Sequence, residues 1–130
     1  MTDDLPQLSD DEEVALHELE LGIEGLRKAH GYLVHFHHAT GHAMSHLRVA
    51  ESNLREAGHD EFADHIRDEI LPCGLLGDER WTYDLLEKFE EEFFNDVLAF
   101  ERDVREDVAS GERHVKERRQ QRRWRERAKE

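Results

Sequence analysis

Residues 85–108 read LLEKFEEEFFNDVLAFERDVREDV and form the most regular stretch of the 130-residue chain. Large apolar side chains recur there at steps of three and four residues, the spacing that puts side chains on one side of an α-helix. This apolar series consists of Leu86, Phe89, Phe93, Val97, Phe100, Val104 and Val108. The stretch predicts a helix of about seven turns. Ser110-Gly111 should end it, because glycine accepts the left-handed conformation that follows many helices.

A second long helix is predicted upstream, beginning after Ser9 and ending before Gly58. Ser9 and Glu12 form a Ser-x-x-Glu capping box, and four acidic residues follow Ser9, where the helix dipole favours negative charge. Apolar residues continue at helical spacing in two registers, the second of which begins near Ala29. Because glycine weakens helices, the four internal glycines lead us to expect a break or kink near residues 28–32.

The segment between the two long helices is predicted to hold a short helix and a loop. Residues 60–71 have helical spacing, with Phe62 and Ile66 expected to face inward, and a proline ends them. Residues 72–78 form the clearest loop, and Asp78 is the expected N-cap of the helix that follows. No alternating polar and apolar run predicts a strand.

These elements predict an all-α fold, an antiparallel helical bundle of two long helices with the short helix packed over one end. Two helices alone cannot cover both of their apolar sides, and Leu85, Phe94 and Leu98 widen the apolar side of the downstream helix. We therefore expect a homodimer that completes a four-helix core. Composition divides the chain into an acidic helical bundle domain, residues 1–111, and a basic C-terminal helical arm or tail, residues 112–130.

The charge of the chain indicates its setting. Acidic residues number 32 against 18 basic ones, the net charge is −14, and the basic set contains 14 Arg but only 4 Lys. Such charge repels itself at ordinary ionic strength, whereas in molar salt the Debye length falls to roughly 3 Å and screens the repulsion. This composition favours a halophilic, salt-adapted cytoplasm over an ordinary acidic protein. Cys73 is the only cysteine, so no intrachain disulfide is expected, and no apolar run predicts a membrane span.

Histidines are concentrated on the upstream helix, where six of the ten fall between residues 30 and 46. Four of them follow one side of a helix at steps of three, four and four residues, and we call these the histidine ladder: His35, His38, His42 and His46. Imidazoles at such spacing can close on one divalent ion such as Zn²⁺, Ni²⁺ or Fe²⁺. The alternative is that they are uncharged polar residues of a surface or interface.

A metal at the ladder needs carboxylate ligands from another segment. The downstream helix offers an acidic run that includes Glu87 and Glu91, and the short helix offers Glu69. Each also has a simpler interpretation, since an acidic run is usually a solvated face and Glu69 can pair with His65. The chain lacks the two Glu-x-x-His motifs of ferritin-like proteins. Its His-x-x-x-His motif comes before its His-x-x-x-Glu motif, the reverse of the order in hemerythrin-like proteins.

The basic tail suggests another kind of contact, because its arginines could bind phosphates and its tryptophan could stack on a base. The residues concerned are Arg118, Arg119, Arg122, Arg123 and Trp124. In a chain of net charge −14, however, the tail is expected to fold back on its own acidic body or on a second copy. No phosphate loop, nucleophile elbow or nucleotide fingerprint occurs, so the sequence names no reaction.

Two segments resemble those of small haloarchaeal helical proteins of uncharacterised function. They are residues 77–83, Gly-Asp-Glu-Arg-Trp-Thr-Tyr, and residues 109–115, Ala-Ser-Gly-Glu-Arg-His-Val. The resemblance covers roughly residues 40–115 and, together with the charge composition, implies a salt-loving cytoplasm and a helical fold. It brings no activity with it.

Three functions follow from these patterns, in order of preference. The first is a salt-adapted cytoplasmic helical interaction or structural protein that forms a homodimer and is not an enzyme. The alternative is a divalent-metal-binding helical protein, or a metal-dependent enzyme, that uses the histidine ladder. The third is nucleic-acid contact through the basic tail, and no membrane partner is expected.

Overall fold

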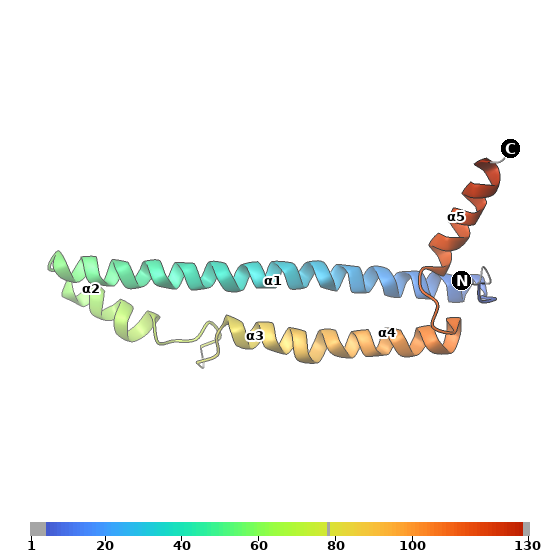
Figure 1. Cartoon of the computed structure of the whole chain (residues 1–130). Helices are drawn as coiled ribbons and strands as arrows, with labels where there is room; N and C mark the ends of the chain where they lie inside the picture. The colour runs from blue at the N-terminus through green and yellow to red at the C-terminus, as the bar shows by residue number, and fades with distance from the viewer. Residues whose placement is uncertain (1–4, 78, 129–130) are drawn as a thin grey trace. The chain divides into compact units, whose positions relative to one another are not determined.

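The computed structural model describes residues 5–77 and 79–128. Its elements, in chain order, are α1 (Asp10–Glu56), α2 (Asp60–His65), the π-helical turn η1 (Ile66–Ile70), α3 (Thr82–Lys88), the π-helical turn η2 (Phe89–Phe93), α4 (Phe94–Ala109) and α5 (Val115–Ala128) (Figure 1). No strand occurs in these described ranges, so the predicted all-α class is confirmed. None of the helices in the same ranges is long and apolar enough to cross a membrane.

The chain divides into two compact units, each of which contains part of α1. Unit 1 comprises residues 1–28 and 93–130 and holds the start of α1 together with α4 and α5. Unit 2 comprises residues 29–92 and holds the rest of α1 together with α2, η1 and α3. The basic tail, predicted as a separate arm, belongs to unit 1 as far as it is described.

The start of α1 confirms the predicted capping box. The Ser9 hydroxyl accepts a hydrogen bond from the Glu12 backbone N–H at 3.1 Å, and the Glu12 carboxylate accepts one from the Ser9 N–H at 2.9 Å. This reciprocal pair satisfies donors that a helix start otherwise leaves unpaired. Asp10 to Glu13 place negative charge in the first turn, where the helix dipole favours it.

The expected break near residues 28–32 is wrong, because α1 runs without interruption for 47 residues. Each internal glycine costs about 1 kcal/mol relative to alanine, yet tertiary contacts support the helix on either side of this region. In unit 1 the Arg27 guanidinium lies 5.7 Å from the ring centre of Phe94. In unit 2 His30 Nε2 lies 2.6 Å from Glu90 Oε2. These contacts offset the loss of helix stability that the internal glycines cause.

α1 ends at Glu56, and Gly58 follows it in a Schellman motif, as predicted. The Gly58 N–H donates to the Arg55 carbonyl at 3.0 Å, and the His59 N–H donates to the Leu54 carbonyl at 2.8 Å. Gly58 has a φ of 88°, which a side chain would make unfavourable. The glycine therefore lets the chain leave α1 and begin α2.

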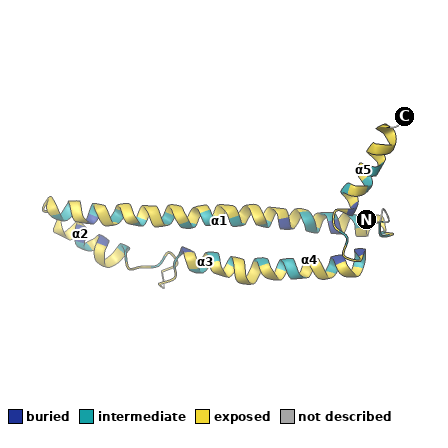
Figure 2. Cartoon of the chain, in the orientation of Figure 1, coloured by how far each residue is buried: buried dark blue, intermediate teal, exposed yellow. Residues whose placement is uncertain are grey.

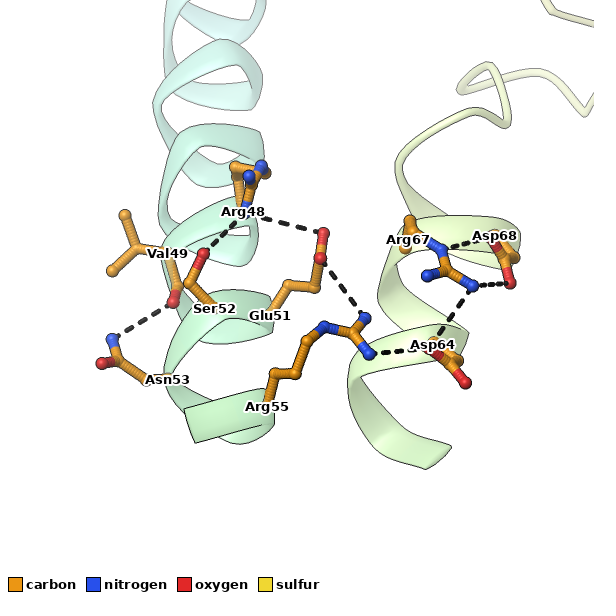
Figure 3. Close-up of polar contacts among 9 residues, drawn as sticks. All are labelled: Arg48, Val49, Glu51, Ser52, Asn53, Arg55, Asp64, Arg67 and Asp68. Carbon is orange, nitrogen blue, oxygen red and sulfur yellow. Dashed lines mark hydrogen bonds and ion pairs between the residues drawn. The ribbon is translucent and has the colours of Figure 1, made fainter. Parts of the chain in front are cut away.

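An ion-pair network holds α2 and η1 against the end of α1 within unit 2 (Figure 3). Arg55 donates to Asp64 at 2.9 Å and reaches the buried Glu51 at 3.5 Å. Arg67 donates to the neighbouring Asp68 at 2.8 Å and also pairs with Asp64 at 3.4 Å. The hydrogen bonds from Arg67 lower the pKa of Asp68 below its ordinary value. The network therefore links the two helices through charges.

The predicted short helix is confirmed over residues 60–70, with a correction to the side that it buries. Ile66 is buried as expected, but Phe62 is 67% exposed and Ala63 takes the inward position. The expected N-cap Asp78 lies outside the described residues. α3 begins at Thr82, where the Trp81 backbone N–H donates to the Asp84 carboxylate at 2.9 Å.

The downstream helix contains a π-helical turn, η2, that the apolar spacing did not predict. A π-turn adds a residue to the helical repeat, so later residues are rotated by about 100°. Phe94 rather than Phe93 is therefore half-buried, and the prediction that Phe93 and Phe100 face inward is wrong, since they are 55% and 58% exposed. The inward positions of α4 are instead Val97, Leu98, Glu101, Val104, Arg105, Val108 and Ala109. α4 stops at Ser110, as predicted.

Buried apolar residues are few in both units (Figure 2). Within unit 1, α4 lies beside the start of α1 (Figure 1), and Leu16, Ala109 and Val115 form a buried cluster. Partly buried side chains that pack against this cluster are Leu8, Val104 and Val108. In the described part of unit 2, the buried apolar residues are Ala63 and Ile66. The core is thin, so polar contacts must help to position the helices.

Candidate metal centre

The histidine ladder lies on the part of α1 that belongs to unit 2. All four of its members are exposed: His35, His38, His42 and His46. His38 and His42 line a cavity of about 440 Å³ together with Trp81 at the start of α3. His37, which the ladder does not include, lines the same cavity, and its Nδ1 lies 2.7 Å from the Thr82 hydroxyl. The ladder therefore borders a partly aromatic hollow with two of its four imidazoles.

In the part of the chain that the structure describes, no carboxylate joins the ladder histidines in a group of three ligands for one ion. Glu69, Glu87 and Glu91, the carboxylates predicted to complete a metal site there, are all exposed. Among the described residues, neither they nor the ladder histidines belong to a group of three side chains that can reach one ion. A metal at the ladder therefore stays a prediction without a completing ligand from this part of the chain.

A different set of histidines and glutamates converges in unit 1. His17 and Glu20 extend from α1, while His114 and Glu117 lie at the start of α5. His17 Nδ1 is 2.5 Å from Glu117 Oε1, and His114 Nδ1 is 3.4 Å from Glu20 Oε2. One ligand atom each from His17, Glu20 and Glu117 lie within 4.8 Å of one another. We call these four residues the His-Glu cluster.

Local structure explains why the His-Glu cluster forms. His17 and Glu20 are three residues apart on α1 and therefore share one side of the helix. After α4 the backbone turns through left-handed conformations, with φ of 52° at Ser110 and 57° at His114. The His114 backbone N–H then donates to Glu20 Oε1 at 2.8 Å. Val115, 4% exposed, anchors the first turn of α5 in the core of unit 1.

Two atoms of the cluster are shielded from solvent and make no hydrogen bond, namely His17 Nδ1 and Glu117 Oε2. His17 Nδ1 is close to the other oxygen of Glu117, but the two atoms do not have hydrogen-bond geometry. Shielded polar atoms without partners are uncommon in folded proteins, and a bound ion is one explanation for them. Imidazole nitrogen and carboxylate oxygen are both ligands of Zn²⁺.

The spacing of the cluster suits one small divalent ion. With zinc–ligand distances of about 2.0–2.1 Å, two ligand atoms of a tetrahedral site are about 3.4 Å apart. Small side-chain rotations bring the atoms of His17, Glu20 and Glu117 to this spacing from their present separations, which all fall within 4.8 Å. His114 Nδ1 lies 3.4 Å from Glu20 and 3.6 Å from Glu117, within ion-pair distance of both carboxylates.

Sequence reasoning missed the His-Glu cluster, although one signal was present. His17-Glu-Leu-Glu20 and His114-Val-Lys-Glu117 are the two His-x-x-Glu spacings in the chain. Ten histidines and 20 glutamates in 130 residues give about 1.5 such spacings by chance, so the motif alone singles out nothing. The convergence depends on the turn at residues 110–114. In this turn His114 has a left-handed backbone conformation that the sequence does not predict.

The residues predicted to contact nucleic acid have different surroundings on α5. Arg119 donates to Glu13 at 2.5 Å and to the Pro6 carbonyl at 2.6 Å, and Arg118 donates to Glu112 at 2.9 Å. The others are half-buried or exposed: Arg122, Arg123 and Trp124. The contacts of Arg119 agree with the expectation that the tail folds back on the acidic body.

No protein-family model, curated protein or solved structure matches the chain.

Proposed function

We propose that the chain binds one divalent transition-metal ion, Zn²⁺ or Fe²⁺, in unit 1 through His17, Glu20 and Glu117. The observation that carries this proposal is their convergence within 4.8 Å from α1 and α5. It is supported by His17 Nδ1 and Glu117 Oε2, which are shielded from solvent and make no hydrogen bond. One imidazole and two carboxylates form a mixed nitrogen and oxygen set that suits these ions and leaves a coordination position open.

Metal binding also has an electrostatic benefit at this place. Glu20 and Glu117 bring two negative charges together in a chain whose net charge is −14. A divalent cation between them removes that repulsion and joins the start of α1 to the start of α5. Because the ligands come from distant segments, the site is complete only in the folded chain, so its binding free energy adds to folding stability.

Zinc titration of untagged, chelator-treated protein tests this proposal. His17→Ala and Glu117→Gln each remove one ligand, and each should weaken zinc binding by tenfold or more, about 1.4 kcal/mol. His42→Ala is the matched control, because it removes the same group from the exposed ladder of the same helix. Zinc affinity that falls in His42→Ala but not in His17→Ala overturns the proposed site and moves it to the ladder.

A second proposal, self-association, is favoured by the exposed apolar side chains. Large apolar residues exposed in unit 1 are Val14, Leu21, Phe93, Phe100 and Trp124, and those in unit 2 are Tyr32, Phe36, Val49, Phe62, Leu75, Leu76, Tyr83 and Leu85. Exposed apolar surface combined with a thin core is typical of a protein that is covered by a partner. We propose that the two long helices pair as an antiparallel bundle and that a second copy completes the core. Light scattering at micromolar concentration should then give the mass of a dimer.

The charge composition supports a third proposal, adaptation to a salt-rich cytoplasm. The 32 acidic residues outnumber the basic ones by 14, so self-repulsion should weaken the fold at low ionic strength. Thermal unfolding followed by circular dichroism should therefore shift to higher temperature between 0.05 and 2 M KCl. An unchanged unfolding temperature over this range contradicts salt adaptation.

A further inference from the structure

A cavity of about 660 Å³ lies in unit 1 beside the His-Glu cluster, between α1, α4 and the start of α5. Glu20, His114 and Glu117 form part of its wall, so the cavity adjoins the proposed metal ligands. Its volume falls in the range of about 300–1,000 Å³ that small-molecule sites occupy. The rest of the wall indicates which kind of molecule the cavity accepts.

Arginine dominates the remaining polar wall of this cavity, which includes Arg27, Arg102, Arg105 and Arg113. Arg27 is held over the ring of Phe94, whereas Arg102 and Arg113 form no ion pair with any described residue. In a chain where acidic residues outnumber basic ones by 32 to 18, these four arginines are a local concentration of positive charge, although four glutamates line the same cavity.

Among the described residues, only one of the four glutamates on the same wall forms an ion pair with one of these arginines. Glu20 and Glu117 are the proposed metal ligands, and Glu24 pairs with Lys28 at 3.7 Å. The fourth, Glu101, is the one that lies beside an arginine of the wall, Arg105. With a divalent ion on the two ligands, the wall has an excess of positive charge.

Arg105 is the buried member of the arginine group and is only 7% exposed. Its Nη1 lies 3.2 Å from Oε1 of the equally buried Glu101, but neither its Nε nor its Nη1 makes a hydrogen bond. A guanidinium carries five N–H donors in a planar fork, and buried donors without acceptors are costly. Both nitrogens are shielded from solvent, but Arg105 lines the cavity, so a rotation of its side chain would offer these donors to an acceptor that the cavity binds.

The position of this ion pair in the helix is itself unusual. A buried ion pair is often no more stabilising than apolar residues of similar size, because two charges must leave water. α4 nevertheless places Glu101 and Arg105 on its inward side while Phe100 is 58% exposed. Ile23 and Leu98 line the cavity beside the charges and provide it with an apolar surface.

We propose that this cavity binds a small molecule through an oxyanion group, either phosphate or carboxylate. Its oxygens accept hydrogen bonds from Arg105, whose planar guanidinium forms bidentate pairs with such groups. One oxygen occupies the open coordination position of the metal. The apolar wall contacts the rest of the molecule. The metal contact rests on the proposed function, whereas the arginine contact stands independently of it.

Isothermal titration calorimetry of the full chain with sulfate and with acetate tests the proposal. Sulfate represents phosphate, which would precipitate zinc, and acetate represents a carboxylate ligand. Each probe is titrated into zinc-loaded and into chelator-treated protein at one chloride concentration. We expect one of the probes to bind both forms and to bind the zinc-loaded form more tightly. The probe that binds identifies the oxyanion, and substitution of Co²⁺ for zinc shows metal contact as a change in the visible spectrum.

Variants separate Arg105 from a general effect of charge. Arg105→Lys keeps the positive charge but lacks the planar guanidinium that forms bidentate hydrogen bonds. It should weaken binding of the probe by tenfold or more. Because Arg105 is buried, Arg113→Gln provides a second variant on the exposed rim of the cavity, with a decrease in the same direction. Arg123→Gln is the control, since it removes an exposed arginine of α5 that does not line the cavity.

The outcomes distinguish this proposal from the metal proposal. Zinc binding without binding of either probe overturns the oxyanion site and leaves the metal site standing. Binding of a probe without zinc binding overturns the metal contact and supports the arginine contact. Equal affinity of the wild type, Arg105→Lys and Arg113→Gln for the probe shows that Arg105 serves only Glu101, and overturns the proposal.

Discussion

The two histidine-rich regions of the chain differ in how their side chains are brought together. In unit 2 the ladder aligns four exposed histidines along one helix, and among the described residues no carboxylate completes a group with them. In unit 1 the turn after α4 brings Glu117 of α5 to within 2.5 Å of His17 on α1. A metal ion needs ligands from several directions around one point. Convergence of separate elements, rather than density of histidine along one helix, therefore decides where an ion can be held.

The largest effect should come from breaking the packing that produces this convergence. Leu16→Ala is expected to lower the free energy of unfolding by about 2–5 kcal/mol, because Leu16 is buried against Ala109 and Val115. Leu21→Ala, on the same helix but 45% exposed, should change it by no more than about 0.5 kcal/mol. Urea unfolding measures both in protein dilute enough to be monomeric. Equal losses from the two variants would contradict the core assigned to unit 1.

Zinc should stabilise unit 1 and leave the ladder region unchanged. At a free zinc concentration 100 times the Kd, the expected gain in the free energy of unfolding is about 2.7 kcal/mol. Wild type and His42→Ala should show this gain, and Glu20→Gln should not. Hydrogen exchange should slow in the first turns of α1 and α5. Protection that instead appears over residues 35–46 would place the ion at the ladder.

The exposed side of α4 offers a smaller effect that concerns assembly rather than folding. Phe100 is 58% exposed, so a charge there should weaken dimerisation without breaking the core of unit 1. We expect Phe100→Glu to raise the dimer dissociation constant by tenfold or more, about 1.4 kcal/mol. Light scattering over a concentration series measures the change, with Asp103→Asn as an exposed control on the same helix. An unchanged mass in both variants argues against this interface.

The smallest effect concerns the charge network of unit 2. The Arg67 side chain lowers the folded-state pKa of Asp68 below its ordinary value of 3.8, mainly by hydrogen bonding. A carboxyl group with a lowered folded pKa adds stability above its unfolded pKa and loses it as pH falls through the folded value. Asp68→Asn should therefore slightly reduce stability at neutral pH and flatten its decline in acid. The effect is small because both side chains are half exposed. Urea unfolding from neutral pH to about pH 2 measures it, and an unchanged pH profile rejects a role for this pair.

The parts of the fold that one segment decides could be predicted from the sequence. The capping box at Ser9 and the glycine ending at Gly58 are local hydrogen-bond patterns, and both are confirmed. The continuity of α1 and the orientation of Phe93 and Phe100 are not local. The first depends on contacts such as His30 with Glu90, and the second on a π-turn that shifts the helical repeat. Periodicity assumes a constant repeat and cannot show where it changes.

The candidate site was beyond sequence reasoning for a related reason. The ladder was visible because its members lie close together along the chain, whereas His17 and Glu117 are brought together by a turn. That turn contains His114 with a φ of 57°, a conformation that is uncommon for a non-glycine residue. The hydrogen bond from His114 to Glu20 supports this conformation, and it exists only after α1 and α4 have packed.

The metal content of the untagged protein, as purified, tests the central claim most directly. Elemental analysis of the wild type should find close to one divalent metal ion per chain. The His42→Ala variant should retain it, and the His17→Ala variant should lose it while keeping its helical circular dichroism. A wild type that carries no metal and takes up no zinc would contradict the claim, as would a His17→Ala variant with its metal intact.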